Sequence, residues 1–309
     1  MNLSRHTKAI LAAIGVYFIW GFTLLASTFA QRVSTPMVYL MYRFDLASLI
    51  MLLPVIFGKR KMALKFRKIF PLLIMGLCEP FIYFIGEQYG LKYTNSSFTG
   101  IFIAIIPLLT TVLASVFFKE SPTVLQWFFC LVSIGGVIAL SIFTSDAGGN
   151  ITLRGIIWLL VAVFSAGGYT MLNKKAAQDN IGVYERTTVT MLVGAVLFTA
   201  SAVLENLGSP GKLIAPVKNL PFDLAVIYVA LFASVIGYTL FNYAVANAPV
   251  ANVVTLNSLV TVLSVAAGVL FLGEPFSWKA GIAMAVVLIG IWGVQRFTRK
   301  EDLQCESSF

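Results

Sequence analysis

Apolar runs of membrane-spanning length follow one another along nearly the whole chain, and polar positions gather in the gaps between them. A transmembrane helix needs about 20 consecutive, mostly apolar residues. The pattern predicts ten such helices, at residues 9–30, 37–57, 69–89, 97–118, 124–144, 155–173, 183–204, 223–243, 252–272 and 278–297. Most connections are short, so we expect an all-α polytopic membrane protein with no separate soluble module.

Composition and charge indicate the environment of the chain and exclude one class of partner. Only 11% of its residues are charged and the mean hydropathy is +0.89, whereas about a quarter of the residues of a soluble domain are charged. The lipid bilayer is therefore the expected environment. The net charge of +9 is divided among short gaps between apolar runs. Phosphate binding needs a broad basic face, so we expect no nucleic-acid partner.

The lysines and arginines also predict an orientation, because cytoplasmic loops carry an excess of them. With the N-terminus inside, fourteen basic residues fall on the inner side and six on the outer side. We therefore expect a multi-pass protein of the cell (inner) membrane with both termini in the cytoplasm. The first apolar run is followed by nine more, so we expect it to be retained and not cleaved as a signal peptide.

Cysteine and histidine are too sparse for a disulfide framework or a metal site. Cys78, Cys130 and Cys305 lie far apart, and the single histidine, His6, precedes the first span. The sequence also contains no Walker loop, so ATP is not expected to drive any activity. We expect no cofactor and no metal.

The chain contains an internal repeat. A shift of 154 residues aligns 86–140 with 240–294 without a gap and places Glu120 on Glu274. A shift near 145 superposes the first two spans on the sixth and seventh. Five spans per half is an odd number, so the second half must be inserted in the opposite orientation. We expect two inverted five-helix repeats, an arrangement typical of secondary transporters with a substrate site near the bilayer midplane. The expected divisions are 1–144, 155–297 and a cytoplasmic tail, 298–309.

Several segments resemble a known family. They are Trp20-Gly21, YRFDLASL (42–49), GLKYTNSSFTGIFIAIIPLLTTVLASVFFKE (90–120) and YAVANAPVANVVTLNSLVTVLSVAAGVLFLGEP (243–275). Together they make the chain similar to the drug/metabolite transporter superfamily, in its EamA-like branch. The resemblance implies a central cavity lined by the first four helices of each half, with the fifth and tenth at the periphery. It also implies transport of small organic solutes, often export of amino acids or related metabolites.

The stretch LCEPFIYFIGEQYG (77–90) places acidic residues inside the third span. A charged group at the bilayer centre costs at least ~2.5 kcal/mol and marks function or pairing by default. Glu79, Tyr83 and Glu87 are spaced i, i+4, i+8 and share one helical stripe, and Pro80 interrupts the hydrogen bonding beside Glu79. Glu79 could exchange a proton, hold a substrate ammonium group, or form a structural salt bridge. Glu87 is expected near the outer mouth, in solvent.

Arg43 and Asp45 lie early in the second span. Two residues apart, they point to different faces and are not expected to pair. Arg43 matches an arginine that is common at this place in the family. It could bind a substrate carboxylate bidentately, or it could bind Glu79 or a carbonyl group permanently. If Arg43 and Glu79 both face the cavity, they would suit a zwitterion.

Aromatic and amide residues complete the candidate site. Aromatic faces bind apolar or cationic groups, although most aromatic residues of membrane helices face lipid or packed core. The further candidates are Tyr17, Trp20, Tyr42, Tyr169, Tyr238 and Asn257. A buried amide such as Asn257 needs partners, so a helix–helix hydrogen bond is its alternative role. Glu185 and Arg186 begin the seventh span and are expected in solvent.

These observations favour a secondary active transporter of an amino-acid-like or amine solute. We expect export by alternating access, with proton coupling at Glu79 as the concrete hypothesis. The expected partners are a small-molecule substrate, protons and lipid, and the sequence leaves monomer and homodimer open. The alternative is a membrane-embedded enzyme or lipid-handling protein. That alternative would need convergent catalytic groups, which the sequence does not indicate.

Overall fold

Helices form the regular structure of this protein, and no strand occurs among the residues that the computed structural model describes. The described residues are 4–60, 62, 66–93, 103, 106–118, 122–144, 152–272 and 278–297. The expected tail 298–309 and the aligned turn residues Glu120 and Glu274 lie outside these ranges.

Each of the ten predicted spans contains an apolar helix in its described residues. The helices of the first half are α1 (Arg5–Gly21), α2 (Thr23–Gln31), α3 (Pro36–Ile56), α4 (Phe66–Gly76), η1 (Leu77–Ile82), α5 (Tyr83–Tyr93), α7 (Ile106–Phe118) and α8 (Val124–Thr144). Those of the second half are α9 (Leu153–Gln178), α10 (Val183–Glu205), α11 (Gly211–Ile214), η2 (Ala215–Lys218), α12 (Leu220–Tyr228), η3 (Val229–Ile236), α13 (Gly237–Asn247), α14 (Val250–Thr255), α15 (Ser258–Leu272) and α16 (Trp278–Arg296). Within the described ranges, six helical stretches are long and apolar enough to cross a membrane, and four shorter apolar helices account for the other predicted spans. The prediction of an all-α polytopic membrane protein is confirmed.

Several helices begin where the local sequence supplies a cap. Thr35 precedes α3 and its hydroxyl oxygen accepts a hydrogen bond from the Val38 amide, while Pro36 occupies the first turn. Thr152 caps α9 in the same way, with the Gly155 amide as donor. Proline is tolerated in the first turn because its missing N–H would have no intrahelical acceptor there. These caps fix where the second and sixth spans begin.

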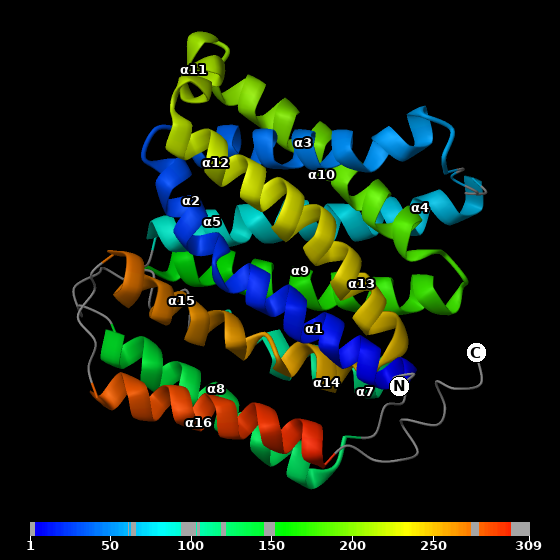
Figure 1. The fold of residues 1–309 in the computed structure, drawn as a ribbon, viewed down its shortest axis with the longest axis vertical. Helices are drawn as coiled ribbons and strands as arrows, with labels where there is room; N and C mark the ends of the chain where they lie inside the picture. The colour runs from blue at the N-terminus through cyan, green and yellow to red at the C-terminus, as the bar shows by residue number, and fades with distance from the viewer. Residues whose placement is uncertain are drawn as a thin grey trace.

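The fifth and tenth helices, α8 and α16, lie against each other along one edge of the molecule (Figure 1). Gly136 of α8 and Gly290 of α16 are aligned by the 154-residue repeat, and each faces the other helix. A Cβ atom on Gly136 would lie 2.8 Å from the Val287 backbone nitrogen, and one on Gly290 would lie 2.5 Å from the Ser133 nitrogen. The two glycines therefore allow close backbone approach. The peripheral position agrees with the resemblance to the EamA-like branch.

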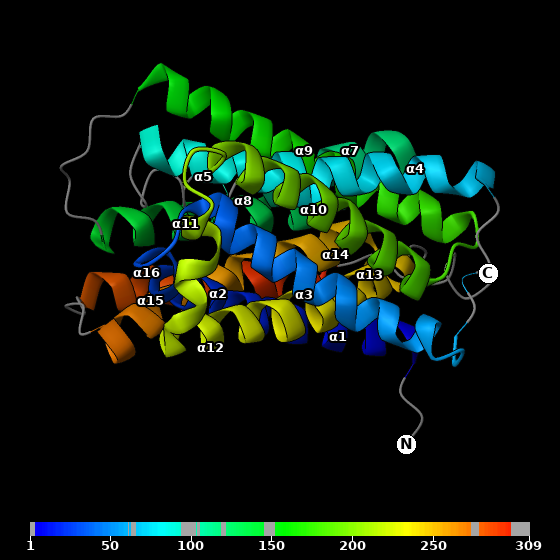
Figure 2. The same cartoon turned by 90° about the horizontal axis from the view of Figure 1, so that it is seen from above.

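Several other helix contacts occur in pairs in which the two halves exchange places. Helix α5 packs on α9 as α13 packs on α1, and α7 packs on α9 as α15 packs on α1. Likewise η1 packs on α10 as η3 packs on α3. Figure 2 shows α4, α5 and α9 on one face and α1 and α12 on the opposite face. Exchanged contacts of this kind are expected of two equivalent halves around a central axis. The residue boundaries of the halves, 1–144 and 155–297, stay a prediction.

Candidate functional site

The third span is interrupted at its middle, where Glu79 lies. Between α4 and α5 the chain forms the π-helical segment η1, and the Glu79 backbone is extended, with φ −142° and ψ 122°. The Ser165 hydroxyl of α9 donates a hydrogen bond to the Cys78 carbonyl oxygen (2.6 Å). An interrupted helix is tolerated in a membrane where neighbouring side chains satisfy the freed backbone groups. The interruption therefore depends on a helix of the second half.

The Glu79 carboxylate is half-buried and meets a hydroxyl group from the second half. Tyr238 of α13 is 1% exposed, and its hydroxyl donates a 2.8 Å hydrogen bond to Glu79 Oε1. No ion pair joins Glu79 to Arg43, although both residues belong to the described part of the chain. A carboxylate offers about four acceptor positions. Glu79 can thus accept further hydrogen bonds while it remains bound to Tyr238.

Aromatic rings from three helices surround this contact. Trp20 of α1 packs edge-on against Tyr17 and Tyr238, with ring centroids 5.5 Å apart in both pairs. Tyr169 of α9 lies 5.9 Å from Tyr238 and stacks on Phe241. We call these five residues the ring cluster. It joins α1 of the first half to α9 and α13 of the second, directly beside Glu79.

The Trp20 indole also binds backbone. Its Nε1 donates to the Ala233 carbonyl oxygen in η3 (2.9 Å). A Cβ atom on Gly237 would lie 2.7 Å from this nitrogen, so glycine is needed for the indole to approach. Trp20 therefore contributes both a ring to the cluster and a donor to the second π-helical segment.

Arg43 is a buried cation at the contact between α3 and η3. It is 4% exposed, and its Nε donates to the Ser234 hydroxyl oxygen (2.9 Å). The guanidinium carbon lies 4.8 Å from the Phe84 ring centroid and 5.1 Å from that of Phe44, within cation–π range. Asp45 instead accepts from the Thr199 hydroxyl at 2.9 and 3.0 Å. The prediction that Arg43 and Asp45 do not pair is confirmed.

The acidic stripe continues along α5. The Tyr83 hydroxyl donates to Glu87 Oε1 (3.0 Å), and both side chains are half-buried. Glu87 is therefore hydrogen-bonded within the protein and only partly open to its surroundings. Gly86 lies on the same helix, and a Cβ atom there would lie 2.8 Å from the Trp158 carbonyl oxygen of α9. The stripe is thus carried by a helix that packs tightly on the second half.

Two predicted residues lie apart from the ring cluster. The Tyr42 hydroxyl donates to the Leu213 carbonyl oxygen of α11 (2.9 Å), and its ring packs on Phe222. Asn257 lies in the turn between α14 and α15. Its side chain is half-buried and makes no hydrogen bond to a described residue. Of the nine predicted site residues, Tyr42 and Asn257 therefore lie apart from the ring cluster, the acidic stripe and the contacts of Arg43.

Arg186 is the functional candidate that the sequence prediction missed. Its expected position in solvent is wrong, since the side chain is 1% exposed. Nη1 donates to the Asn173 carbonyl oxygen (3.1 Å) and to the Asn173 side-chain oxygen. The position of Arg186 in the first turn of α10 suggested the membrane interface, and nothing along that single helix indicates that α9 covers it.

A buried hydrogen-bond network links this arginine to the ring cluster. Asn242 of α13 accepts from Asn173 Nδ2 and from the Tyr169 hydroxyl, each at 2.8 Å. The Asn242 amide nitrogen in turn donates to the Thr187 hydroxyl oxygen beside Arg186 (2.8 Å). We call Tyr169, Asn173, Arg186, Thr187 and Asn242 the amide network. It runs from the ring cluster to the start of α10.

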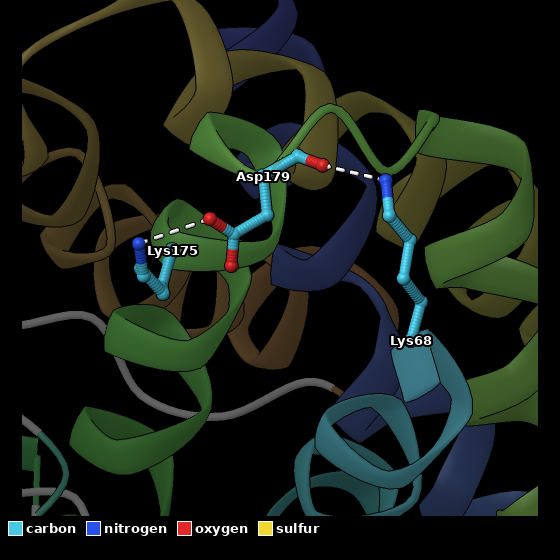
Figure 3. Close-up of polar contacts among 3 residues, drawn as sticks. All are labelled: Lys68, Lys175 and Asp179. Atoms are coloured by element: carbon cyan, nitrogen blue, oxygen red, sulfur yellow. Dashed lines mark hydrogen bonds and ion pairs between the residues drawn. The ribbon is translucent and has the colours of Figure 1, made fainter. Parts of the chain in front are cut away.

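A surface cluster lies at the same end of the molecule (Figure 3). Lys68 of α4 donates to the Asp179 carbonyl oxygen (2.8 Å), and Lys175 forms an ion pair with the Asp179 carboxylate (2.9 Å). The Lys175 and Asp179 side chains are 61% and 50% exposed, so this pair is solvated. No group of three metal-ligating side chains occurs among the described residues. The polar groups enclosed by the helices, by contrast, lie around Glu79, Arg43 and the amide network.

Comparison with known proteins agrees with the fold. The model of the EamA-like transporter family matches residues 7–142 and again residues 153–296. The uncharacterized transporter YcxC of Bacillus subtilis is 28% identical over 291 residues, 94% of this chain and 93% of its own. An uncharacterized transporter of Archaeoglobus fulgidus is 24% identical over 295 residues, 94% of this chain and 99% of its own. One protein crystal structure, 17% identical, shares the fold with a TM-score of 0.77 over 96% of this chain and 99% of its own.

Proposed function

Because the chain belongs to the EamA-like transporter family, we propose that it exports an amino-acid-like or amine solute by alternating access, coupled to protons at Glu79. The family membership expected from the motifs is confirmed, and the relatives are named transporters. The substrate class, the direction and the coupling are our proposal. So is the view that the protein has no enzymatic activity, because the buried polar groups suit binding and release without a chemical step.

The hydrogen bond between Glu79 and Tyr238 carries the proposal. It joins the two halves at the middle of the third span, the depth at which transporters with inverted repeats bind substrate. Alternating access moves one half against the other, so a contact between them has to change during the cycle. Burial disfavours a charged carboxylate, and protonation of Glu79 would therefore favour one arrangement of the halves. Release of that proton would favour the other.

The charges suit a zwitterionic solute. Arg43 lies on α3 and Glu79 in η1, and no ion pair joins them. An arginine left without a carboxylate partner could take a substrate carboxylate, and Glu79 could take the ammonium group. The aromatic faces of Trp20 and Tyr17 would accept the apolar part of the solute. An amine without a carboxylate would use Glu79 and the rings alone.

Topology and direction complete the proposal. Both termini would lie in the cytoplasm, and α10 would then begin at the cytoplasmic side of the cell membrane. The excess of basic residues on that side supports this orientation. Export rests on the resemblance to metabolite exporters.

The test is uptake by purified protein in liposomes, measured for twenty amino acids and their amines, with and without an imposed pH gradient. Glu79→Gln should lower the kcat/KM of the best substrate at least tenfold and abolish the response to the gradient. Glu205→Gln is the matched control, because Glu205 is exposed at the end of α10. Wild-type rates in Glu79→Gln, or transport that ignores the gradient in the wild-type protein, would contradict the proton coupling.

A further inference from the structure

We infer that Arg186 is a second carboxylate-binding subsite, which holds the carboxylate of the solute in the state that opens toward the start of α10. This inference rests on the proposed function and extends it. It assigns to the amide network a role in substrate recognition.

The first argument is that Arg186 is buried and forms no ion pair with a described residue. A guanidinium group carries its charge at any pH compatible with folding, and this one is 1% exposed. Its hydrogen-bond acceptors are the backbone and side-chain oxygens of Asn173, both neutral. The carboxylate of Glu185 folds back over Gly182 at the start of α10. A buried charge without a contacting counter-charge is destabilising, so a carboxylate that contacts Arg186 would be bound favourably.

The second argument is an unused donor. Arg186 Nε is buried and has no hydrogen-bond partner among the described residues. Buried polar groups are almost always hydrogen-bonded, so each exception needs a reason. A carboxylate is the natural partner because it binds guanidinium through two parallel hydrogen bonds. The Arg186 side chain is thus charged and buried, and its Nε donor has no acceptor among the described residues.

The third argument is the relation of Arg186 to Arg43. Helices α3 and α10 pack side by side (Figure 1), and they are the second helices of the two halves. Arg43 is the eighth residue of α3 and Arg186 the fourth of α10. If the halves are inverted, the two helices start at opposite faces of the membrane. Alternating access exchanges the roles of the halves, so one arginine would serve each face.

The fourth argument is that the amide network connects Arg186 to the residues beside Glu79. It runs from Arg186 through Asn173 and Asn242 to Tyr169, whose ring contacts Tyr238 beside Glu79. Buried hydrogen bonds and one ring contact therefore connect Arg186 to the Glu79 contact. An amine that lacks a carboxylate would gain nothing from Arg186.

The experiment compares an amino acid with its amide from each face of the membrane. The probes are the amino acid of the twenty that wild-type protein transports fastest and the corresponding amino-acid amide. Liposomes with oriented protein present each probe to one face at a time. Arg186→Gln should reduce the preference for the acid over the amide at least tenfold at the face where α10 starts, mainly through KM. Arg43→Gln should do so at the opposite face.

The control is Lys59→Gln, which removes an exposed positive charge near the end of α3 and should leave the preference unchanged. If Arg186→Gln does not fold, Arg186→Lys retains the charge without the planar fork and should still weaken the preference. An unchanged preference in the folded Arg186 variant would overturn the inference and leave the role of Glu79 intact. If no amino acid is transported at all, the result contradicts both the role of Arg186 and the proposed substrate class.

Discussion

Each half contains a span that a π-helical segment interrupts, and the two interruptions differ in the charged residue at their contacts. In the first half, η1 interrupts the third span, and in the second half, η3 interrupts the eighth. Each segment has a carbonyl oxygen that accepts from a side chain on the first helix of the other half. Ser165 of α9 donates to Cys78, and Trp20 of α1 donates to Ala233. The donors are 145 residues apart, which is the shift that superposes the first spans of the halves.

The difference between the segments lies in their charged contacts. The segment η1 presents a carboxylate, Glu79, to Tyr238 of the second half. The segment η3 presents a neutral hydroxyl, Ser234, to the Arg43 guanidinium of the first half. The two segments thus share their backbone contacts between the halves and differ in the charged group at each contact. Substitutions that separate these two functions test the comparison.

The largest effect is expected from Tyr238→Phe, which removes only the hydroxyl that binds Glu79. A hydrogen bond to a charged group contributes about 1.5–3 kcal/mol, which corresponds to a loss in kcat/KM of roughly tenfold or more. Liposome uptake would measure the loss. Tyr42→Phe is the matched control, because that hydroxyl binds the Leu213 carbonyl away from the ring cluster. Equal losses of kcat/KM in both variants would show that the hydrogen bond to Glu79 matters no more for transport than the hydrogen bond of Tyr42.

Most of the fold could be predicted from the sequence. Ten apolar runs identify ten spans because a bilayer requires about 20 apolar residues for each crossing. Pro80 predicts the interruption of the third span, because proline removes a backbone donor from the helix. Glu79 stands out since a carboxylate inside an apolar run is costly. These features are local in the chain, so a single sequence contains them.

The site is less predictable because it is assembled from different helices. The position of a residue along a helix indicates its depth in the membrane. It does not indicate which way the side chain points or which helix it contacts. Tyr42 and Tyr238 look equivalent in the sequence, yet Tyr42 binds α11 and Tyr238 binds Glu79. Arg186 looks solvated because it begins a helix, and its burial depends on Asn173 of another helix. Such pairings depend on the packing of segments far apart in the chain.

An intermediate effect on stability is expected from Trp20→Phe. The substitution keeps an aromatic ring beside Tyr17 and Tyr238 and leaves the Ala233 carbonyl without its donor. Hydrogen bonds within membranes contribute about 0.6–2 kcal/mol, so the free energy of unfolding should fall by roughly 1–2 kcal/mol. Unfolding in mixed detergent micelles measures this value. Unchanged stability would mean that water or another side chain donates a hydrogen bond to the Ala233 carbonyl in place of Trp20.

A smaller loss is expected from Ser165→Ala, which removes the donor to the Cys78 carbonyl. The change deletes one oxygen and leaves the ring cluster untouched, so we expect a loss of about 0.5–1 kcal/mol. The double variant with Trp20→Phe should show additive losses, because the two bonds join different pairs of helices and share no residue. A coupling above about 0.5 kcal/mol would instead show that the two interruptions are held as one unit.

The smallest effect is expected from Lys175→Ala, which removes a hydrogen-bonded ion pair that lies outside both interruptions (Figure 3). Exposed pairs spaced i, i+4 contribute about 0.3–0.5 kcal/mol because water screens them and ordering the side chains costs entropy. The free energy of unfolding should therefore change by less than that of Ser165→Ala, and raised salt should abolish the difference. The Lys68 contact to the Asp179 backbone would remain. A loss as large as that of Trp20→Phe would mean that this exposed pair at the end of α9 stabilises the protein as much as the contact between Trp20 and η3 does.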